Sequence, residues 1–241
     1  MKINTNSNTY IIIYSGVMVV IVAFVLAFVY QSLKSRQDAN VALDKKKQIL
    51  AALNIRDLTD EEAAARYAEV VQADRIVDAA GKVVAPGTQG GEQAAFSMNA
   101  IPADKSRLPI YLCSVDGKKK YVVPVYGMGL WGSIWGYVAV NEDMNTVYGA
   151  YFDHASETAG LGAEIKDSKT WQEQFAGKRI YDGNNEKVIL AVKKTSEIKD
   201  TTCECDAVTG ATLTSDGVSK MLESGLRLYV PFFQQESNQT K

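Results

Sequence analysis

The sequence predicts an α+β protein with a single N-terminal transmembrane helix, followed by a domain with an antiparallel sheet and flanking helices. Three observations lead to this fold class: an uncharged apolar run near the N-terminus, two hairpin-like stretches after Leu108, and a helical pattern after Thr212. The 241 residues carry 26 Lys and Arg against 28 Asp and Glu, and this near-neutral balance argues against nucleic-acid binding. Three cysteines are too few for a disulfide scaffold.

The first element is the run from Tyr10 to Tyr30, which contains no charged residue. At about 1.5 Å per residue, it matches a hydrocarbon core of about 30 Å. A cleaved signal peptide is the alternative, but its apolar run spans only about 7–15 residues, and no small-x-small cleavage site follows Tyr30. We therefore expect residues 1–9 to be a tail and residues 10–30 an uncleaved anchor.

Residues 31–106 are expected to form a helical linker and a variable insertion. Helix-forming residues after the anchor continue the first helix out of the membrane. Thr59 and Glu62 have the spacing of a capping box, which predicts a second helix through about Gln72. The stretch from Ala79 to Ser106 is rich in Gly, Ala and polar residues, so we expect a loop there.

Residues 107–234 are expected to be the α+β domain, and residues 235–241 a C-terminal tail. Two hairpins are predicted, one over residues 110–126 around an Asp-Gly turn and one over residues 135–152 around the sequence NEDMNT. Pro124 cannot donate a ladder hydrogen bond, so it places its strand at an edge or a bulge.

Shorter elements follow the hairpins. Ser168 is a candidate N-cap for a short helix that Gly177 ends. The apolar run over residues 187–193 predicts a further strand. A last helix is expected from Thr212 to about Leu228.

The densest chemical signal is the segment DAVTGATLTSDGV, which begins at Asp206. A glycine-containing turn there delivers several hydroxyls to the start of a helix, where free amides and the helix dipole favour an anion such as phosphate. The alternative is that the same hydroxyls, on Thr209, Thr212, Thr214 and Ser215, are ordinary turn and N-cap groups, which local physics alone favours. Both interpretations remain open at this point.

The pattern Asp-x-x-Thr-Gly-Ala-Thr resembles the flavinylation motif of FMN-binding domains in bacterial membrane redox complexes. The matching residues are Asp206, Thr209, Gly210, Ala211 and Thr212. In that family FMN is joined through its phosphate to the hydroxyl of the last threonine, so the resemblance implies covalent FMN on Thr212.

The resemblance extends over nearly the whole chain and is weakest between about residues 75 and 106. The segments DANVALDKKKQIL, GLWG, GYVAV, ETAGLG, WQEQFAGKRIYD and VILAVK follow in the order seen in the C-subunits of the sodium-translocating NADH:quinone reductases. This implies a membrane-anchored translocase component that relays electrons from NADH toward ubiquinone through FMN and couples them to Na⁺ export. Its implied partners are the other subunits of that complex and a flavin transferase.

Two rival functions remain open. The equivalent flavoprotein of a ferredoxin:NAD⁺ reductase complex shares the threonine motif, although Gly-Leu-Trp and DANVALDKKKQIL favour the quinone reductase. A tethered binding module without a cofactor would use the threonine cluster only as a cap. No dinucleotide fingerprint or P-loop appears in the sequence, so we expect no direct NADH binding.

By resemblance, a second loop lies against the flavin, and its glycines allow close backbone approach. Its residues are Glu157, Thr158, Gly160, Leu161 and Gly162. Ala159 stands where the family usually has Pro, which reduces the rigidity of the loop.

Three further residues complete the candidate flavin site. Lys193 matches a family lysine near the cofactor, and its neighbour Lys194 could take that place instead. Trp131 either flanks the flavin ring or packs in the core. Asp206 serves the geometry of its turn or recognition by the transferase.

Charge counting and resemblance disagree on orientation. Lys34, Arg36 and residues 45–47 follow the anchor, and positive-inside counting alone would place the domain in the cytoplasm. The resemblance instead implies a single-pass protein of the bacterial inner membrane with its domain on the periplasmic side, and we follow it.

Other chemistry is not expected. Cys203 and Cys205, with Cys113 and His154, lack the spacing of common zinc sites, and a disulfide to Cys113 cannot be deduced from sequence. One histidine and no Gly-x-Ser-x-Gly give no support for a hydrolase triad. We therefore expect no metal site, no role for His154 and no catalytic residue beyond the cofactor.

Overall fold

The computed structural model describes residues 7–98, 106–183 and 186–239. The chain divides into two compact units, Met1–Lys45 and Lys46–Lys241. The first unit consists mainly of helix α1 (Asn8–Ala52), which continues into the second. The apolar stretch of α1 has no buried residue, and α1 is long and apolar enough to cross a membrane. The predicted anchor and its helical continuation both lie within α1.

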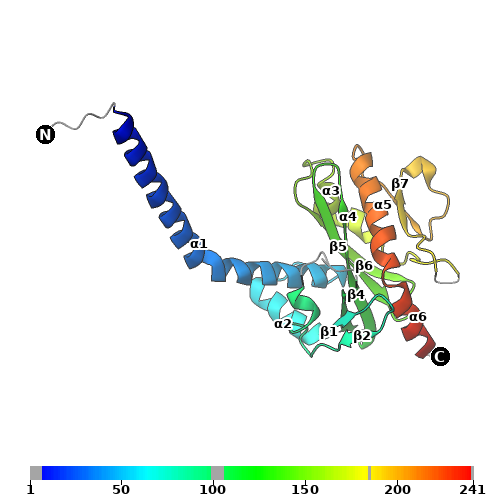
Figure 1. Ribbon diagram of the computed structural model, residues 1–241. Coiled ribbons are helices and arrows are strands. Elements are labelled where there is room, and N and C mark those ends of the chain that lie inside the picture. Colours follow the sequence, from blue (N-terminus) through cyan, green and yellow to red (C-terminus); the bar gives the residue numbers. More distant parts are fainter. Residues whose placement is uncertain (1–6, 99–105, 184–185, 240–241) are drawn as a thin grey trace. The chain divides into compact units, whose positions relative to one another are not determined.

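The second unit is built on an antiparallel sheet of six strands in the order β2-β1-β3-β4-β5-β6 (Figure 1). Its strands are β1 (Val71–Val77), β2 (Val83–Ala85), β3 (Leu108–Val115), β4 (Lys118–Met128), β5 (Ser133–Asn141) and β6 (Val147–His154). The two predicted hairpins are confirmed as β3–β4 and β5–β6, with Leu112 opposite Tyr121 and Val138 opposite Ala150.

Strands β1 and β2 were not predicted. The sequence of β1 contains Asp74, which is fully buried although charged residues rarely are. Its carboxylate accepts hydrogen bonds from the backbone amides of Ala94 (2.5 Å) and Phe96 (3.1 Å). Residues 94–96 of the expected loop are therefore hydrogen-bonded to β1 through the buried carboxylate of Asp74. A search for alternating apolar residues does not detect a strand that is stabilised in this way.

Pro124 lies in β4, which has neighbours on both sides in the sheet order. The β3–β4 pairing ends at Tyr111 opposite Val122, while β4 and β5 stay paired through Met128 opposite Ser133. Pro124 therefore occupies a part of β4 that is locally an edge, where its missing N–H removes no bond to β3.

The remaining elements are mostly helical. The helices are α2 (Asp60–Val70), α3 (Glu164–Asp167), α4 (Lys169–Glu173), α5 (Thr212–Arg227) and α6 (Val230–Gln239), with 3₁₀ turns at Ala95–Ser97 and Thr195–Glu197. A small parallel pair, β7 (Ala191–Lys193) and β8 (Glu204–Asp206), completes the fold.

The predicted helix starts are correct. Thr59 and Glu62 form a complete capping box at α2. Ser168 accepts the backbone N–H of Trp171 at the start of α4, which ends earlier than expected. β7 is shorter than the predicted strand, and neither β8 nor α6 was predicted. In α6, Phe232 and Phe233 pack edge-on against Tyr121, which explains a helix in a segment of weak periodicity.

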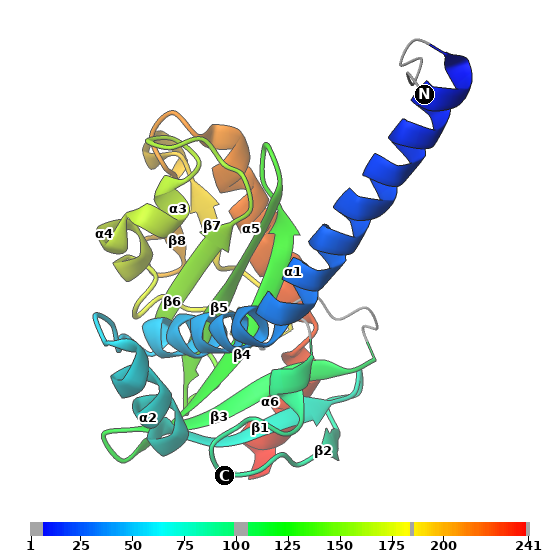
Figure 2. The same ribbon diagram turned by 90° about the vertical axis from the view of Figure 1, so that its left-hand side faces the viewer.

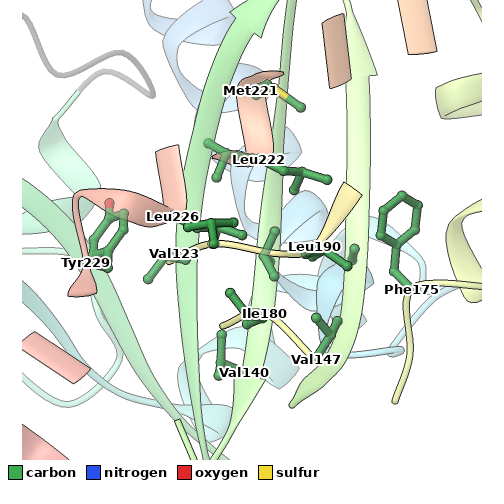
Figure 3. Close-up of a cluster of buried hydrophobic side chains, with 14 of the residues drawn as sticks. Val123, Val140, Val147, Phe175, Ile180, Leu190, Met221, Leu222, Leu226 and Tyr229 are labelled. Carbon is green, nitrogen blue, oxygen red and sulfur yellow. The ribbon is translucent and has the colours of Figure 1, made fainter. Parts of the chain in front are cut away.

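Alternate residues of β4 face opposite sides of the sheet. Val123 lies in the main core with Leu222 and Leu226 of α5 (Figure 3), and Val125 belongs to the same core. Residues 46–52, the part of α1 in the second unit, lie across the other face (Figure 2), where Gln48 accepts a hydrogen bond from Nε1 of Trp135 (3.2 Å).

Helix α5 packs closely along β4 through two of its glycines. A Cβ at Gly217 would lie 2.4 Å from the carbonyl oxygen of Met128, and one at Gly225 would lie 2.8 Å from Cγ1 of Val125. The N-terminus of α5 is thereby brought to the end of β4 where the chain turns into β5.

Candidate functional site

Three segments meet at the N-terminus of α5: residues 128–132 from the last residue of β4 to the start of β5, residues 155–163 after β6, and the turn at residues 207–211. The first touches α5 at Gly217. The second touches the turn, because a Cβ at Gly210 would lie 2.9 Å from Cδ2 of Leu161. The structure thus brings together most of the residues that the sequence singled out.

The turn before α5 fixes where Thr212 lies. The N–H of Ala211 donates to the carbonyl of Val208 (3.1 Å), and Gly210 has a φ of +78°, a conformation that glycine adopts readily. Ser215 Oγ accepts the N–H of Val208 (3.0 Å), which ties the turn to the helix. Thr212 is consequently the first residue of α5, with an exposed side chain.

Within the described part of the chain, no side chain caps α5. Its N-cap residue is Ala211, and the first turn contains no acidic residue. The hydroxyl of Thr214 donates to Glu157 and that of Ser215 accepts from Val208, so neither serves as a cap. The interpretation of these hydroxyls as N-caps is therefore wrong, and the N-terminal amides and the positive dipole end of α5 have no capping side chain beside the exposed Thr212.

Glu157, in the second segment, connects the first segment to the first turn of α5. Its side chain is only 8% exposed. Oε1 accepts the backbone N–H of Trp131 (2.9 Å), and Oε2 accepts the hydroxyl of Thr214 (2.6 Å). Gly129 and Gly162 make room for the carboxylate, since a Cβ at either position would lie 2.5 Å or less from one of its oxygens.

Exposed large apolar side chains lie on two of these segments and at Leu213, next to Thr212 in the chain, and are called the apolar rim below. Trp131 is 67% exposed, so the alternative that it packs in the core is wrong. The other exposed large apolar side chains of the rim are Met128, Leu130, Leu161 and Leu213. An apolar surface next to an open helix N-terminus suits a ligand with a planar ring and a phosphate.

The backbone of Asp206 is held by two side chains that the sequence analysis did not single out. Trp171 Nε1 donates to its carbonyl (2.7 Å), and the Gln174 amide bonds both its carbonyl (3.0 Å) and its N–H (2.6 Å). These two side chains thus fix the start of the turn, while the Asp206 side chain is exposed.

Lys193 lies on β7 behind the turn. Its ammonium forms an ion pair with Glu204, and its carbonyl accepts the N–H of Ala207 (2.8 Å). The hydrogen bond from Lys193, with backbone N–H groups of Asp200 and Lys199, lowers the pKa of the Glu204 carboxyl to about 2. Lys194 instead lies 3.9 Å from Glu197 at the surface.

His154 has a contact that its lone position in the sequence did not suggest. Its Nδ1 accepts the backbone N–H of Glu157 (3.1 Å), which helps to order the loop after β6. The three cysteines are free and buried, and the described residues contain no group of three or more metal-ligating side chains.

The model of the FMN-binding domain family matches residues 129–227, which include all three segments of the site apart from Met128. The matched part of the chain is therefore an FMN-binding domain, and a membrane-length helix precedes it in the sequence.

Its relatives define the family more closely. The C-subunit of the Na(+)-translocating NADH-quinone reductase of Haemophilus ducreyi is 32% identical over 85% of this chain and 86% of the relative. The crystal structure of the same protein from Parabacteroides distasonis has a TM-score of 0.76 and 36% identity, covering 83% of this chain and 96% of that one. Shewanella oneidensis NqrC has a TM-score of 0.65 and 27% identity, covering 83% and 98%. The chain belongs to this family, the C-subunits of the Na(+)-translocating NADH-quinone reductases.

Proposed function

We propose that this protein is the membrane-anchored flavin subunit of a Na⁺-translocating NADH:quinone reductase and carries FMN through a phosphoester to Thr212. The observation that carries the assignment of Thr212 is its exposed hydroxyl at the uncapped N-terminus of α5. A phosphate joined there would meet free amides and the positive end of the helix dipole.

The residues around Thr212 fit such a group. Thr209 and Gly210 form the turn that presents the hydroxyl, and the exposed rim, including Trp131 and Leu161, offers apolar area for a flavin ring. Bound FMN would supply the electron-carrying chemistry, while the chain holds its phosphate, orients its ring and limits its contact with water. Lys193, paired with Glu204, would act on the site mainly by supporting the turn.

The relatives favour this function over both rivals. Those named above belong to the Na(+)-translocating NADH-quinone reductase, which disfavours the flavoprotein of a ferredoxin:NAD⁺ reductase complex. A binding module without a cofactor would explain neither the match to the FMN-binding domain family nor the uncapped N-terminus of α5.

The attachment is tested by producing the protein with an active flavin transferase and examining a denaturing gel under ultraviolet light. We expect a fluorescent band near 26.3 kDa that Thr212→Val abolishes. Thr170→Val is the matched control, because Thr170 is also an exposed threonine in the first turn of a helix. A dark wild-type band, or a fluorescent Thr212→Val band, would overturn the assignment.

The named relatives are subunits of a larger complex, and we infer the corresponding partners for this chain: further membrane and peripheral subunits, and a flavin transferase for maturation. We further infer that the domain lies on the periplasmic side of the bacterial inner membrane, as the family resemblance implies. A compartment-specific reporter fused after Lys241 should be active only outside the cytoplasm. Activity inside would reverse this orientation.

A further inference from the structure

Glu157 differs from the other residues near Thr212 because it is a charged residue whose side chain is buried. Both carboxylate oxygens accept hydrogen bonds, which suits an ionised carboxylate because that form has acceptors only. Its donors belong to different elements, the loop between β4 and β5 and the first turn of α5. Glu157 itself belongs to the loop after β6, so one side chain joins all three.

The surroundings show that this position is fitted to a carboxylate. A Cβ added to Gly162 would lie 2.4 Å from Oε2 of Glu157 and 2.7 Å from Oγ1 of Thr214, so a larger residue would not fit there. Ser156 Oγ donates to the carbonyl of Trp131 (3.1 Å), so the backbone of Trp131 is held on both its N–H and its carbonyl by neighbouring residues of one loop. The backbone that carries the exposed Trp131 ring is thereby set at a fixed place relative to Thr212.

The charge of Glu157 has a separate consequence. The carboxylate is bonded to Thr214, two residues from Thr212, and a buried charge is screened by salt much less than an exposed one. Reduction adds negative charge to a flavin, and a fixed negative charge nearby makes that addition less favourable.

We propose that Glu157 is a positioning residue with two effects. It holds the loop between β4 and β5, residues 129–132, against the first turn of α5; this loop is called the Trp131 loop and this connection the lock. Through its buried negative charge, Glu157 also lowers the reduction potential of the flavin on Thr212. The second part rests on the proposed function, whereas the lock belongs to the protein without its cofactor.

The lock is tested in flavin-free Thr212→Val protein by measuring hydrogen exchange at the Trp131 amide. Glu157→Ala should speed this exchange about tenfold, since it removes the acceptor. Glu157→Gln should keep the amide protected, because its carbonyl can accept from Trp131 and its NH₂ can donate to Thr214. Unchanged exchange in Glu157→Ala, with native circular dichroism, would overturn the lock.

A second pair of variants tests the other end of the lock. Thr214→Val removes the hydroxyl donor and should also speed exchange at Trp131, and Thr214→Ser should restore protection. If Thr214→Val exchanges like the Thr212→Val parent, Glu157 does not couple α5 to the Trp131 loop.

The charge is tested by the midpoint potential of the flavin-carrying fraction. Glu157→Gln should shift it to a more positive value, while Glu223→Gln, which removes an exposed carboxylate near the other end of α5, should leave it unchanged. Equal potentials in Glu157→Gln and wild type would overturn the charge effect. A wild type without flavin would defeat the proposed function, and the exchange measurements would still decide the lock.

Discussion

Helices α2 and α5 both begin near threonines, but their N-termini are built in opposite ways. At α2, Thr59 accepts the N–H of Glu62, Glu62 bonds back to Thr59, and the first turn is acidic. At α5, the N-cap is Ala211, the first turn carries no acid, and Thr212 is exposed. A helix end closed by its own side chains gains stability, whereas an open one can hold an anion.

The open end of α5 implies that its stability comes from packing along β4 and not from its cap. Leu222 is fully buried in the core (Figure 3), and Leu222→Ala should lower the free energy of unfolding by about 2–5 kcal/mol. Urea denaturation of the flavin-free protein measures this. A loss below about 1 kcal/mol would show that α5 does not depend on this face.

The side chains of Glu157 and Thr214, at the N-terminus of α5, pack so closely against Gly162 that only glycine fits there. Gly162→Ala would force its Cβ against Glu157 and Thr214, and we expect a loss of about 1–3 kcal/mol in unfolding free energy together with a weaker flavin signal. Gly160→Ala is the matched control in the same loop. It meets no atom within 4 Å and is disfavoured only by its φ of +72°, so its loss should be near 1 kcal/mol. Equal losses in the two variants would contradict the close fit.

The comparison of the two helix ends predicts that a threonine variant at α2 changes stability but not flavin attachment, and that a threonine variant at α5 does the reverse. Thr59→Ala removes a capping box and should destabilise the flavin-free protein by about 1 kcal/mol, with flavin attachment retained. Thr212→Ala should change stability by less than about 0.5 kcal/mol and abolish attachment. A cost for Thr212→Ala that matches the cost for Thr59→Ala would mean that Thr212 caps α5 after all.

The smallest effect concerns acid stability behind the turn. The pKa of the Glu204 carboxyl falls from 4.5 to about 2 in the folded protein because Lys193 and backbone amides favour its ionised form. A folded-state pKa below the unfolded one gives stability that is present above pH 4.5 and is lost as the pH falls toward 2. The free energy of unfolding of wild type should therefore exceed that of Glu204→Gln above pH 4.5, and this difference should shrink as the pH falls toward 2. A difference that stays constant over this range would contradict the ion pair.

The sequence predicted the elements whose signals are local. The membrane-length run, the two hairpins, the capping box at Thr59 and the helix after Thr212 depend on neighbouring residues, and all are present. β1, β8 and α6 depend on tertiary contacts, such as the burial of Asp74 and the packing of Phe232 on Tyr121. Their own residues carry little periodic signal.

The candidate site shows the same division. The motif around Thr212 was found through its resemblance to a family, while local physics could not separate a cap from an anion site. The contacts of Thr214, His154 and Gln174 went unnoticed because each acts on a residue far away in sequence or through the backbone. Only the structure places them beside the turn and the loop after β6.

The most direct test of the central claim is fragmentation mass spectrometry of the tryptic peptide covering residues 200–220, taken from protein made with a flavin transferase. This peptide contains Thr209, Thr212, Thr214 and Ser215, so it carries every hydroxyl of the motif that competes as the attachment site. The account predicts one FMN phosphoester, located on Thr212 at the open end of α5. An unmodified peptide, or FMN on any of the other three residues, would contradict it.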